Sequence, residues 1–186
     1  MNSPSQELVV LLDDAGRSIG TAVKAEVHHG STPLHLAFSC YVFDDTGRVL
    51  LTRRALHKRA FPGVWTNSFC GHPGPGESLT GAVVRRARDE LGIDIAELRC
   101  VLPDFRYQAV DASGVVENEV CPVFCGRAVG TLDLDPAEIV DSAWVPWDQL
   151  RVAAQLPWAI SPWSAEQIPL LDAAGVGRQP IGQPGT

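Results

Sequence analysis

Cys70 and His72 lie two residues apart in a loop broken by glycine and proline, within the stretch W-T-N-S-F-C-G-H-P-G-P-G. A single cysteine is more often a buried apolar thiol than a reactive one, but a position beside a histidine in a glycine-rich loop favours chemistry. A thiol with an ordinary pKa of about 8.5 is mostly protonated at neutral pH. A reactive Cys70 thiolate would therefore have to be stabilised by nearby arginines or a metal.

Two glutamates, Glu117 and Glu119, alternate in the segment 115–124, which has the pattern of a strand. Residues two apart in a strand share a face and lie about 7 Å apart at the backbone. Their carboxylates can therefore converge on one cation. An isolated E-x-E is more often an exposed strand face, so both interpretations stand at this point.

The cysteine loop leads into a predicted helix that carries two charges on its apolar face. Ser78 is the expected N-cap, and Gly92 lies just past the expected end. An apolar stripe begins at Leu79, and its helical spacing continues to Arg86 and Glu90. A carboxylate in the last turn costs about 0.3–1 kcal/mol through the helix dipole. The two charges indicate a bound cation or substrate, with a solvated Arg86–Glu90 pair as the alternative.

Basic side chains gather in the loop that precedes the cysteine, at Arg53, Arg54, Lys58 and Arg59. Arginine offers a planar fork to phosphate oxygens, and lysine offers a compact charge. A solubilising loop is the common explanation for such a cluster, but this loop runs directly into the Cys70 segment. We therefore interpret it as a phosphate-binding loop.

The elements that must position these residues are mostly strands. We expect strands at residues 7–12, from 34 onward, 49–53, 105–109, 115–124 and 143–147, with turns at 44–47 and 111–114. Asp148 is expected to cap a short helix, and Trp158 and Trp163 to close over the sheet. We predict one domain at residues 1–174, and a disordered tail at the Gly/Pro/Gln-rich residues 175–186.

The composition is that of a globular protein, with 45% hydrophobic and 20% charged residues and a net charge of −7. This negative charge argues against a nucleic-acid partner. We find no signal-peptide pattern and no run of the roughly 20 apolar residues that a membrane span needs. The five cysteines form no disulfide-framework pattern. We expect a cytoplasmic protein that is a monomer or weak dimer.

The predicted loop and helix resemble the Nudix box, G-x5-E-x7-R-E-U-x-E-E-x-G-U. The matching residues are Gly71, Glu77, Arg85, Asp89, Glu90 and Gly92. One position departs from the box, because Arg86 stands where a metal-binding glutamate is expected. The segments W-T-N-S-F-C-G-H-P and E-N-E-V-C-P-V-F narrow the resemblance to type I isopentenyl diphosphate isomerases, from about His28 to Trp163. The family implies a Nudix fold of the α+β class, an α/β/α arrangement in which helices flank a mixed β-sheet.

The resemblance also implies a set of binding residues. A divalent metal, Mn²⁺, Zn²⁺ or Fe²⁺, would be held by His28, His35, His72, Glu117 and Glu119. We choose His28 over its neighbour His29 because His28 lies seven residues before His35. A Mg²⁺ ion would bridge Glu90 and the substrate diphosphate. The substrate itself would be bound by Lys24, Arg54, Lys58, Gly71 and Arg86.

The implied reaction moves a double bond, from isopentenyl diphosphate to dimethylallyl diphosphate, and needs an acid and a base on opposite faces of the alkene. Cys70 and Glu119 are the candidates, with Tyr107 assisting the glutamate and Trp163 shielding a carbocation. One alternative is a Nudix hydrolase of a nucleoside diphosphate derivative, which would not need the cysteine. Another is a zinc-stabilised binding domain, which chelation would unfold.

Overall fold

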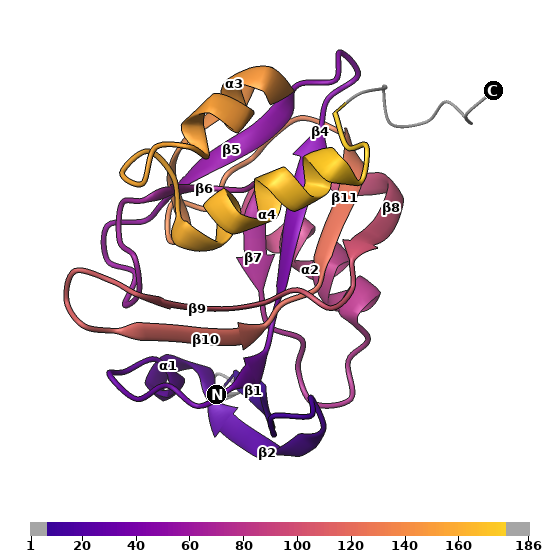
Figure 1. Cartoon of the computed structure of the whole chain (residues 1–186). Helices are drawn as coiled ribbons and strands as arrows, with labels where there is room; N and C mark the ends of the chain where they lie inside the picture. Colours follow the sequence, from indigo (N-terminus) through magenta and orange to yellow (C-terminus); the bar gives the residue numbers. More distant parts are fainter. Residues whose placement is uncertain (1–6, 178–186) are drawn as a thin grey trace.

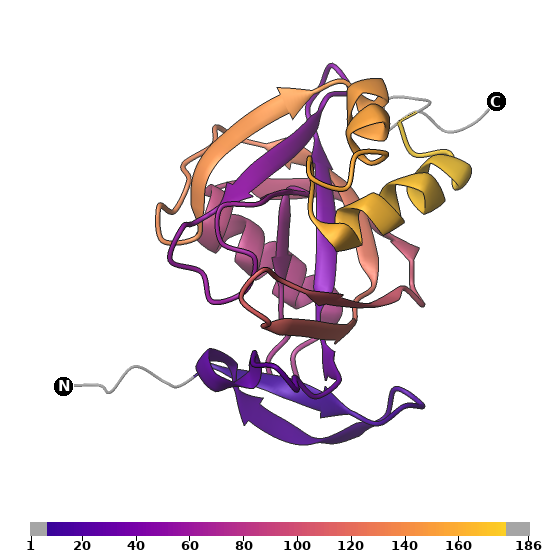
Figure 2. The ribbon, with the colours of Figure 1, turned by 60° about the vertical axis from the view of Figure 1, so that its left-hand side comes forward.

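The structure is a computed structural model that describes residues 7–177. Its first sheet contains the N-terminal strands and a later hairpin (Figure 1), in the order β2-β1-β3-β10-β9. These strands are β1 (Leu8–Leu12), β2 (Ser18–Val23), β3 (His35–Leu36), β9 (Arg106–Val110) and β10 (Val116–Val120). In Figure 2 the β1–β2 hairpin forms the lowest layer of the molecule, beneath β9 and β10.

The second sheet has the order β12-β5-β4-β11-β8, and two short strands extend it, with β6 paired to β5 and β7 paired to β4. Its strands are β4 (Phe38–Phe43), β5 (Val49–Arg54), β6 (Trp65–Thr66), β7 (Phe69–Gly71), β8 (Asp94–Leu102), β11 (Val123–Val129) and β12 (Ile139–Val145). The sheet is mixed, because β4 and β11 run parallel while β5 and β12 run antiparallel.

Helices cover both faces of this second sheet. They are α2 (Leu79–Leu91), α3 (Trp147–Ala153) and α4 (Pro162–Ala173), whereas the short α1 (Lys24–Val27) packs against β1 and β2 of the first sheet. Helix α2 lies behind the sheet in Figure 1, and α4 crosses its front. The predicted α+β class with an α/β/α arrangement is therefore confirmed. The predicted ends of α2 are also confirmed, since the Ser78 side chain accepts from the N–H of Gly81 and Gly92 adopts a φ of 67°.

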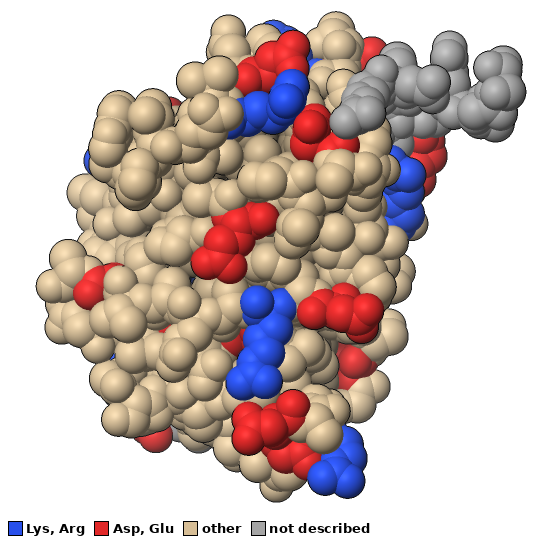
Figure 3. All heavy atoms as spheres, in the orientation of Figure 1, with Lys and Arg blue, Asp and Glu red and all other residues tan. Residues whose placement is uncertain are grey.

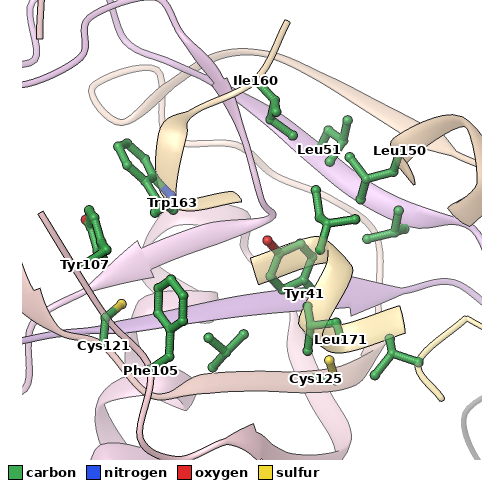
Figure 4. Packing of buried hydrophobic residues seen from close by; sticks show 14 of the residues in the cluster. Tyr41, Leu51, Phe105, Tyr107, Cys121, Cys125, Leu150, Ile160, Trp163 and Leu171 are labelled. Atoms are coloured by element: carbon green, nitrogen blue, oxygen red, sulfur yellow. The ribbon is translucent and has the colours of Figure 1, made fainter. Parts of the chain in front are cut away.

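Two hydrophobic clusters fill the interfaces between these layers. One cluster lies between the second sheet and α2, and includes Phe38, Phe69 and Leu91. The other lies under α3 and α4, where Figure 4 shows Tyr107 and Trp163 toward one end. Alternate residues of β4 enter opposite clusters, because successive side chains of a strand point to opposite faces.

The prediction of continuous strands from residue 34 onward and at 115–124 was wrong. Each of these segments forms two strands, one in each sheet. One path passes from β3 to β4 at Ala37, and the other from β10 to β11 at Cys121 and Pro122. The paths stay side by side, since the N–H of Ala37 donates to the carbonyl of Val120 at 2.9 Å. His35 is consequently paired in register with Glu119.

The region around α3 and α4 differs from prediction in two details. Trp163 is buried, but Trp158 is 82% exposed and does not close over the sheet. Pro146, rather than Asp148, occupies the N-cap position of α3, and Asp148 lies in the first turn.

The folded part extends beyond residue 174. Val176 is buried and packs in the cluster under α4, so residues 175–177 belong to the packed domain. Residues 178–186, the rest of the predicted tail, lie outside the described part of the chain.

The surface shown in Figure 3 carries acidic and basic side chains in small groups of both signs. Within residues 7–177, none of the helices combines the length and the apolar character that crossing a bilayer requires.

Candidate active site

A cavity of about 430 Å³ brings together residues from both sheets and from α2 and α4. All but one of the predicted site residues line it directly, and the exception, His35, contacts two of the lining residues. The lining residues among them are Lys24, His28, Arg54, Lys58, Cys70, Gly71, His72, Arg86, Glu90, Tyr107, Glu117, Glu119 and Trp163. The histidines group with Glu117 and Glu119, which we call the first end, and Lys24, Lys58 and Arg86 group with Glu7, Glu90 and Glu138, which we call the other end.

Four predicted metal ligands converge at the first end. Ligand atoms of His28, His35, His72 and Glu119 all lie within 4.8 Å of one another. The Nε2 atoms of His35 and His72 are 3.2 Å apart, and they lie 3.4 Å and 3.0 Å from Oε1 of Glu119. The fifth predicted ligand, Glu117, is adjacent, with Oε2 located 3.0 Å from Nε2 of His28.

The hydrogen bonds around this cluster fit a divalent cation. Nδ1 of His35 donates to the carbonyl of Pro33 at 2.9 Å, which orients the ring with Nε2 toward the cluster. Nδ1 of His72 is buried without a hydrogen-bond partner, and Nε2 of His28 and Oε2 of Glu117 are buried 3.0 Å apart with no hydrogen-bond partner around them. Such orphaned atoms are costly in a protein interior unless an ion or water satisfies them. The donor set of imidazoles and carboxylates suits Mn²⁺, Zn²⁺ or Fe²⁺.

Burial and mutual contacts set the protonation states of the same residues. Burial lowers the pKa of His72 to about 4, so its imidazole is neutral at pH 7. Burial alone would raise the pKa of Glu119, but hydrogen bonds with His35 and His72 hold it well below the usual range. Burial and the charge of Glu119 raise the pKa of Glu117. The cluster thus combines a neutral imidazole with an ionised carboxylate, as metal binding requires.

The thiol of Cys70 lies in the wall of the same cavity as Glu119. Its Sγ donates to Oδ1 of Asn67 at 3.3 Å and lies 3.4 Å from Oγ of Ser39. Burial raises the pKa of Cys70 to about 12, although Ser39 and Asn67 act in the opposite direction. Burial of this thiol therefore disfavours the thiolate that we expected at Cys70.

Tyr107 and Trp163 form the aromatic part of the cavity wall. The hydroxyl of Tyr107 donates to Oε2 of Glu119 at 2.9 Å, on the side away from the histidines. The Tyr107 and Trp163 rings are 5.6 Å apart, and Phe61 meets Trp163 edge-on at 5.1 Å. Trp163 donates from Nε1 to Oδ1 of Asn67 at 3.0 Å. Both rings are therefore held by polar contacts as well as by packing.

The predicted diphosphate-binding cations line the other end, and each already has a protein partner. Lys24 pairs with Glu7 at 2.6 Å, and Lys58 pairs with Glu138. Arg54 donates to the carbonyl of Ala60, with its guanidinium carbon 5.7 Å from the centre of the Trp163 ring.

Arg86 and Glu90 form a buried ion pair on α2, with Nη2 and Oε1 separated by 2.6 Å. Their side chains are only 9% and 6% exposed, which excludes the solvated pair that was the alternative. A second carboxylate, that of Glu138, lies 3.3 Å from Nη2 of Arg86. Burial opposes the charge of Arg86, but Glu90 and Glu138 raise its pKa above the ordinary value.

Gly71 permits a close approach between β7 and α2. A Cβ at this position would lie 2.8 Å from the ring of Phe38 and 2.9 Å from Cγ of Arg86. Nearby, Glu77 accepts from the N–H of Gly74 and from Arg85, at 2.8 Å in each case, and so closes the loop between β7 and α2. These contacts fix the distance between the cysteine loop and the helix.

Comparisons with known proteins agree with this architecture. The chain matches the NUDIX domain over residues 33–171. An isopentenyl-diphosphate Delta-isomerase of Mycolicibacterium vanbaalenii is 72% identical over 93% of this chain and 96% of the relative. Another, from Clavibacter michiganensis subsp. michiganensis, is 59% identical over 89% of this chain and 86% of the relative. The chain belongs to the NUDIX family and, within it, to the isopentenyl-diphosphate Delta-isomerases.

Solved structures with the same fold are more distant in sequence. A protein of Deinococcus radiodurans has a TM-score of 0.69 at 18% identity, covering 88% of this chain and 98% of that one. A MutT protein of Methanosarcina mazei Go1 has a TM-score of 0.61 at 18% identity, covering 77% and 96%. At such identities the likeness shows the NUDIX fold alone.

Several residues of this NUDIX site were not anticipated from the sequence. They are Glu7, Ser39, Phe61, Asn67, Glu138 and Gln167. Phe61 adopts a left-handed φ of 49° while its ring meets Trp163. Gln167 of α4 donates to Ser39 Oγ at 3.0 Å, directly beneath the thiol. Asn67 lies within the quoted segment W-T-N-S-F-C-G-H-P but was given no role there, and the other five residues belong to no quoted motif, so only their spatial neighbours identify them.

Proposed function

We propose that this chain interconverts isopentenyl diphosphate and dimethylallyl diphosphate by a 1,3-allylic proton rearrangement in isoprenoid biosynthesis. The observation that carries the proposal is that the Cys70 thiol and the Glu119 carboxylate line one cavity together with Lys24, Arg54, Lys58 and Arg86. Membership of the isopentenyl-diphosphate Delta-isomerase family supports the same activity.

Cys70 and Glu119 are proposed as the two proton-transfer groups. Protonation of the terminal alkene carbon leaves a tertiary carbocation at C3, and loss of a proton from C2 then forms the new double bond between C2 and C3. A protonated thiol and an ionised carboxylate together hold one transferable proton. One group can therefore supply a proton while the other accepts one, which is the requirement of the reaction.

The aromatic residues are proposed to stabilise and orient the reacting groups. The Tyr107 hydroxyl holds Oε2 of Glu119 and so fixes the direction of that carboxylate. The buried face of Trp163 would shield the carbocation, since a cation–π contact in a dry site contributes about 2 kcal/mol. Exclusion of water by this wall protects the carbocation from quenching.

Lys24, Arg54, Lys58 and Arg86 are proposed to bind the diphosphate, with Gly71 allowing the close packing of the loop beside them. Glu90 would hold a Mg²⁺ ion that enters with the diphosphate, since Mg²⁺ commonly takes one or two carboxylates together with phosphate oxygens. This end of the cavity would position the alkene between the thiol and the glutamate.

The metal at the other end is proposed to be Mn²⁺, Zn²⁺ or Fe²⁺, held by His28, His35, His72, Glu117 and Glu119. When bound, such an ion would supply positive charge beside the reacting carboxylate. We further propose a cytoplasmic monomer or weak dimer. The five cysteines are all free thiols in the structure, which suits a reducing compartment.

Incubation of the protein with isopentenyl diphosphate and Mg²⁺ in D₂O tests the function. We expect dimethylallyl diphosphate that carries deuterium in a methyl group, detected by NMR or mass spectrometry. The principal alternative is a Nudix hydrolase of a nucleoside diphosphate derivative. Release of phosphate or of a nucleoside monophosphate, without deuterated dimethylallyl diphosphate, would establish that alternative.

A further inference from the structure

Glu138 is a carboxylate of the cavity that has no role in the function proposed above. It precedes β12 in a turn that is anchored on two sides. Its carbonyl accepts from the N–H of Ala55 at 2.9 Å, at the start of the basic loop. The N–H of Asp135 in the same turn donates to the carbonyl of Glu90 at 2.9 Å. The backbone therefore holds Glu138 between the basic loop and α2.

The Glu138 side chain contacts two of the cations proposed to bind the diphosphate. It forms an ion pair with Lys58, and its Oε1 lies 3.3 Å from Nη2 of Arg86. The Glu138 side chain is 20% exposed and the Arg86 side chain 9% exposed, so water screens these contacts weakly. A diphosphate that used Lys58 and Arg86 would have to compete with this carboxylate.

The charges in this cluster balance without any ligand. Lys58 and Arg86 contribute two positive charges, and Glu90 and Glu138 contribute two negative charges. A bare diphosphate, with about three negative charges near neutral pH, would meet both carboxylates and would be repelled by each. A Mg²⁺–diphosphate complex carries two fewer negative charges, so the same carboxylates repel it much less.

We propose that Glu138 is a specificity-determining residue that selects the Mg²⁺ complex of a diphosphate over the bare diphosphate. Its carboxylate occupies Lys58 and Arg86 in the ligand-free cavity and disfavours any ligand of high negative charge. This inference rests on the proposed function for the position of the diphosphate. It assigns to Glu138 the coupling between metal binding and substrate binding.

The test compares wild-type protein with Glu138→Gln, which keeps the side-chain shape and removes the charge. Binding of inorganic diphosphate is measured by calorimetry with and without Mg²⁺. We expect bare diphosphate to bind about tenfold more tightly to the variant. Binding in the presence of Mg²⁺ should change by less than about threefold, as expected for the smaller ligand charge. The enhancement of binding by Mg²⁺ should therefore fall.

Two further variants make the test specific. Asp141→Asn removes the same charge from an exposed position of β12 that does not line the cavity, and should leave both affinities unchanged. In a Lys58→Gln background, Glu138→Gln should increase the affinity for bare diphosphate by a smaller factor. One of the two cations for which Glu138 and the diphosphate compete is then already absent. Glu138→Asp, whose shorter side chain moves the carboxylate away from Arg86, should increase the affinity for bare diphosphate by a smaller factor than Glu138→Gln. It replaces Glu138→Gln if the glutamine variant does not fold.

Three results would overturn the inference. Unchanged or weaker binding of bare diphosphate to Glu138→Gln would mean that the carboxylate does not oppose the ligand. Weaker binding only in the presence of Mg²⁺ would make Glu138 a metal ligand instead. If wild-type protein binds no diphosphate with or without Mg²⁺, the proposed function fails and this inference fails with it.

Discussion

Asn67 is the residue through which the thiol and the indole are held in a fixed relation. It is fully buried, and its Nδ2 donates to the carbonyls of Cys40 and Phe69 at 3.0 Å and 2.6 Å. Since Nε1 of Trp163 can only donate, the amide oxygen must face both Trp163 and Cys70. The sequence predicted Cys70 and Trp163 but not Asn67, because an uncharged amide acquires this importance only through its neighbours in space.

The prediction at the scale of single residues concerns the thiol. Cys70→Ser should reduce kcat by about 10²–10⁴-fold, the range for loss of a general acid or base. The serine hydroxyl can still donate to Asn67, so the fold, the bound metal and the affinity for Mg²⁺–diphosphate should be retained. Steady-state kinetics, metal analysis and calorimetry measure these three properties.

The matched control for this variant is Cys100→Ser, because Cys100 is exposed and does not line the cavity. It should keep full activity. Activity of Cys70→Ser within a factor of ten of wild type would show that the thiol does not transfer a proton.

At the scale of elements, the metal-binding cluster forms where two adjacent segments, β3–β4 and β10–β11, pass from the first sheet to the second. Alternation along residues 115–124 correctly predicted that Glu117 and Glu119 share a face of one strand, and both are buried in β10. The breaks at Ala37 and Pro122 were not predicted, because alternation continues through them. The pairing of β3 with β10 is a long-range contact, so local pattern could not indicate that His35 lies opposite Glu119.

The packing of α2 against β7 gives the prediction at this scale. Gly71→Ala would place a Cβ 2.8 Å from Phe38 and 2.9 Å from Arg86, so these neighbours must shift. We expect a loss of about 1–3 kcal/mol in the free energy of unfolding, as for other overpacked sites. Displacement of Arg86 should also weaken binding of Mg²⁺–diphosphate. Urea unfolding and calorimetry measure the two effects.

Gly30→Ala provides the comparison for Gly71→Ala, since its Cβ would meet only a carbonyl oxygen at an ordinary 3.6 Å. Its free energy of unfolding should change by less than about 0.5 kcal/mol, as is usual for surface substitutions. Equal losses in the two variants would contradict the close approach of β7 and α2.

At the scale of the whole molecule, the histidine cluster joins parts of the chain that the hydrophobic clusters do not. His35 and Glu119 belong to the first sheet, His28 follows α1, and His72 follows β7 of the second sheet. A bound metal would therefore cross-link the N-terminal sheet to the loop before α2. The two hydrophobic clusters pack the second sheet against its helices without any ligand, so the fold does not depend on the metal alone.

Chelation should therefore lower the thermal midpoint of the protein without unfolding it at 25 °C. A ligand present at a thousandfold over its Kd stabilises the native state by about 4 kcal/mol, which corresponds to roughly 10 °C for a domain of this size. Calorimetry with and without EDTA, and circular dichroism at 25 °C, measure the shift and the retained structure. Complete unfolding on chelation would instead support the alternative of a zinc-stabilised binding domain.

The two adjacent histidines decide whether that shift arises at the assigned site. His28→Asn should abolish the EDTA-dependent shift, because Nε2 of His28 faces the cluster. His29→Asn should preserve it, because His29 lies outside the cluster and its Nδ1 accepts from the N–H of Ser31 at 3.1 Å. The substitutions have the same chemistry and lie one residue apart, so general effects on the segment cancel. Loss of the shift in His29→Asn alone would transfer the metal ligand to His29 and would contradict the assignment of His28 to the cluster.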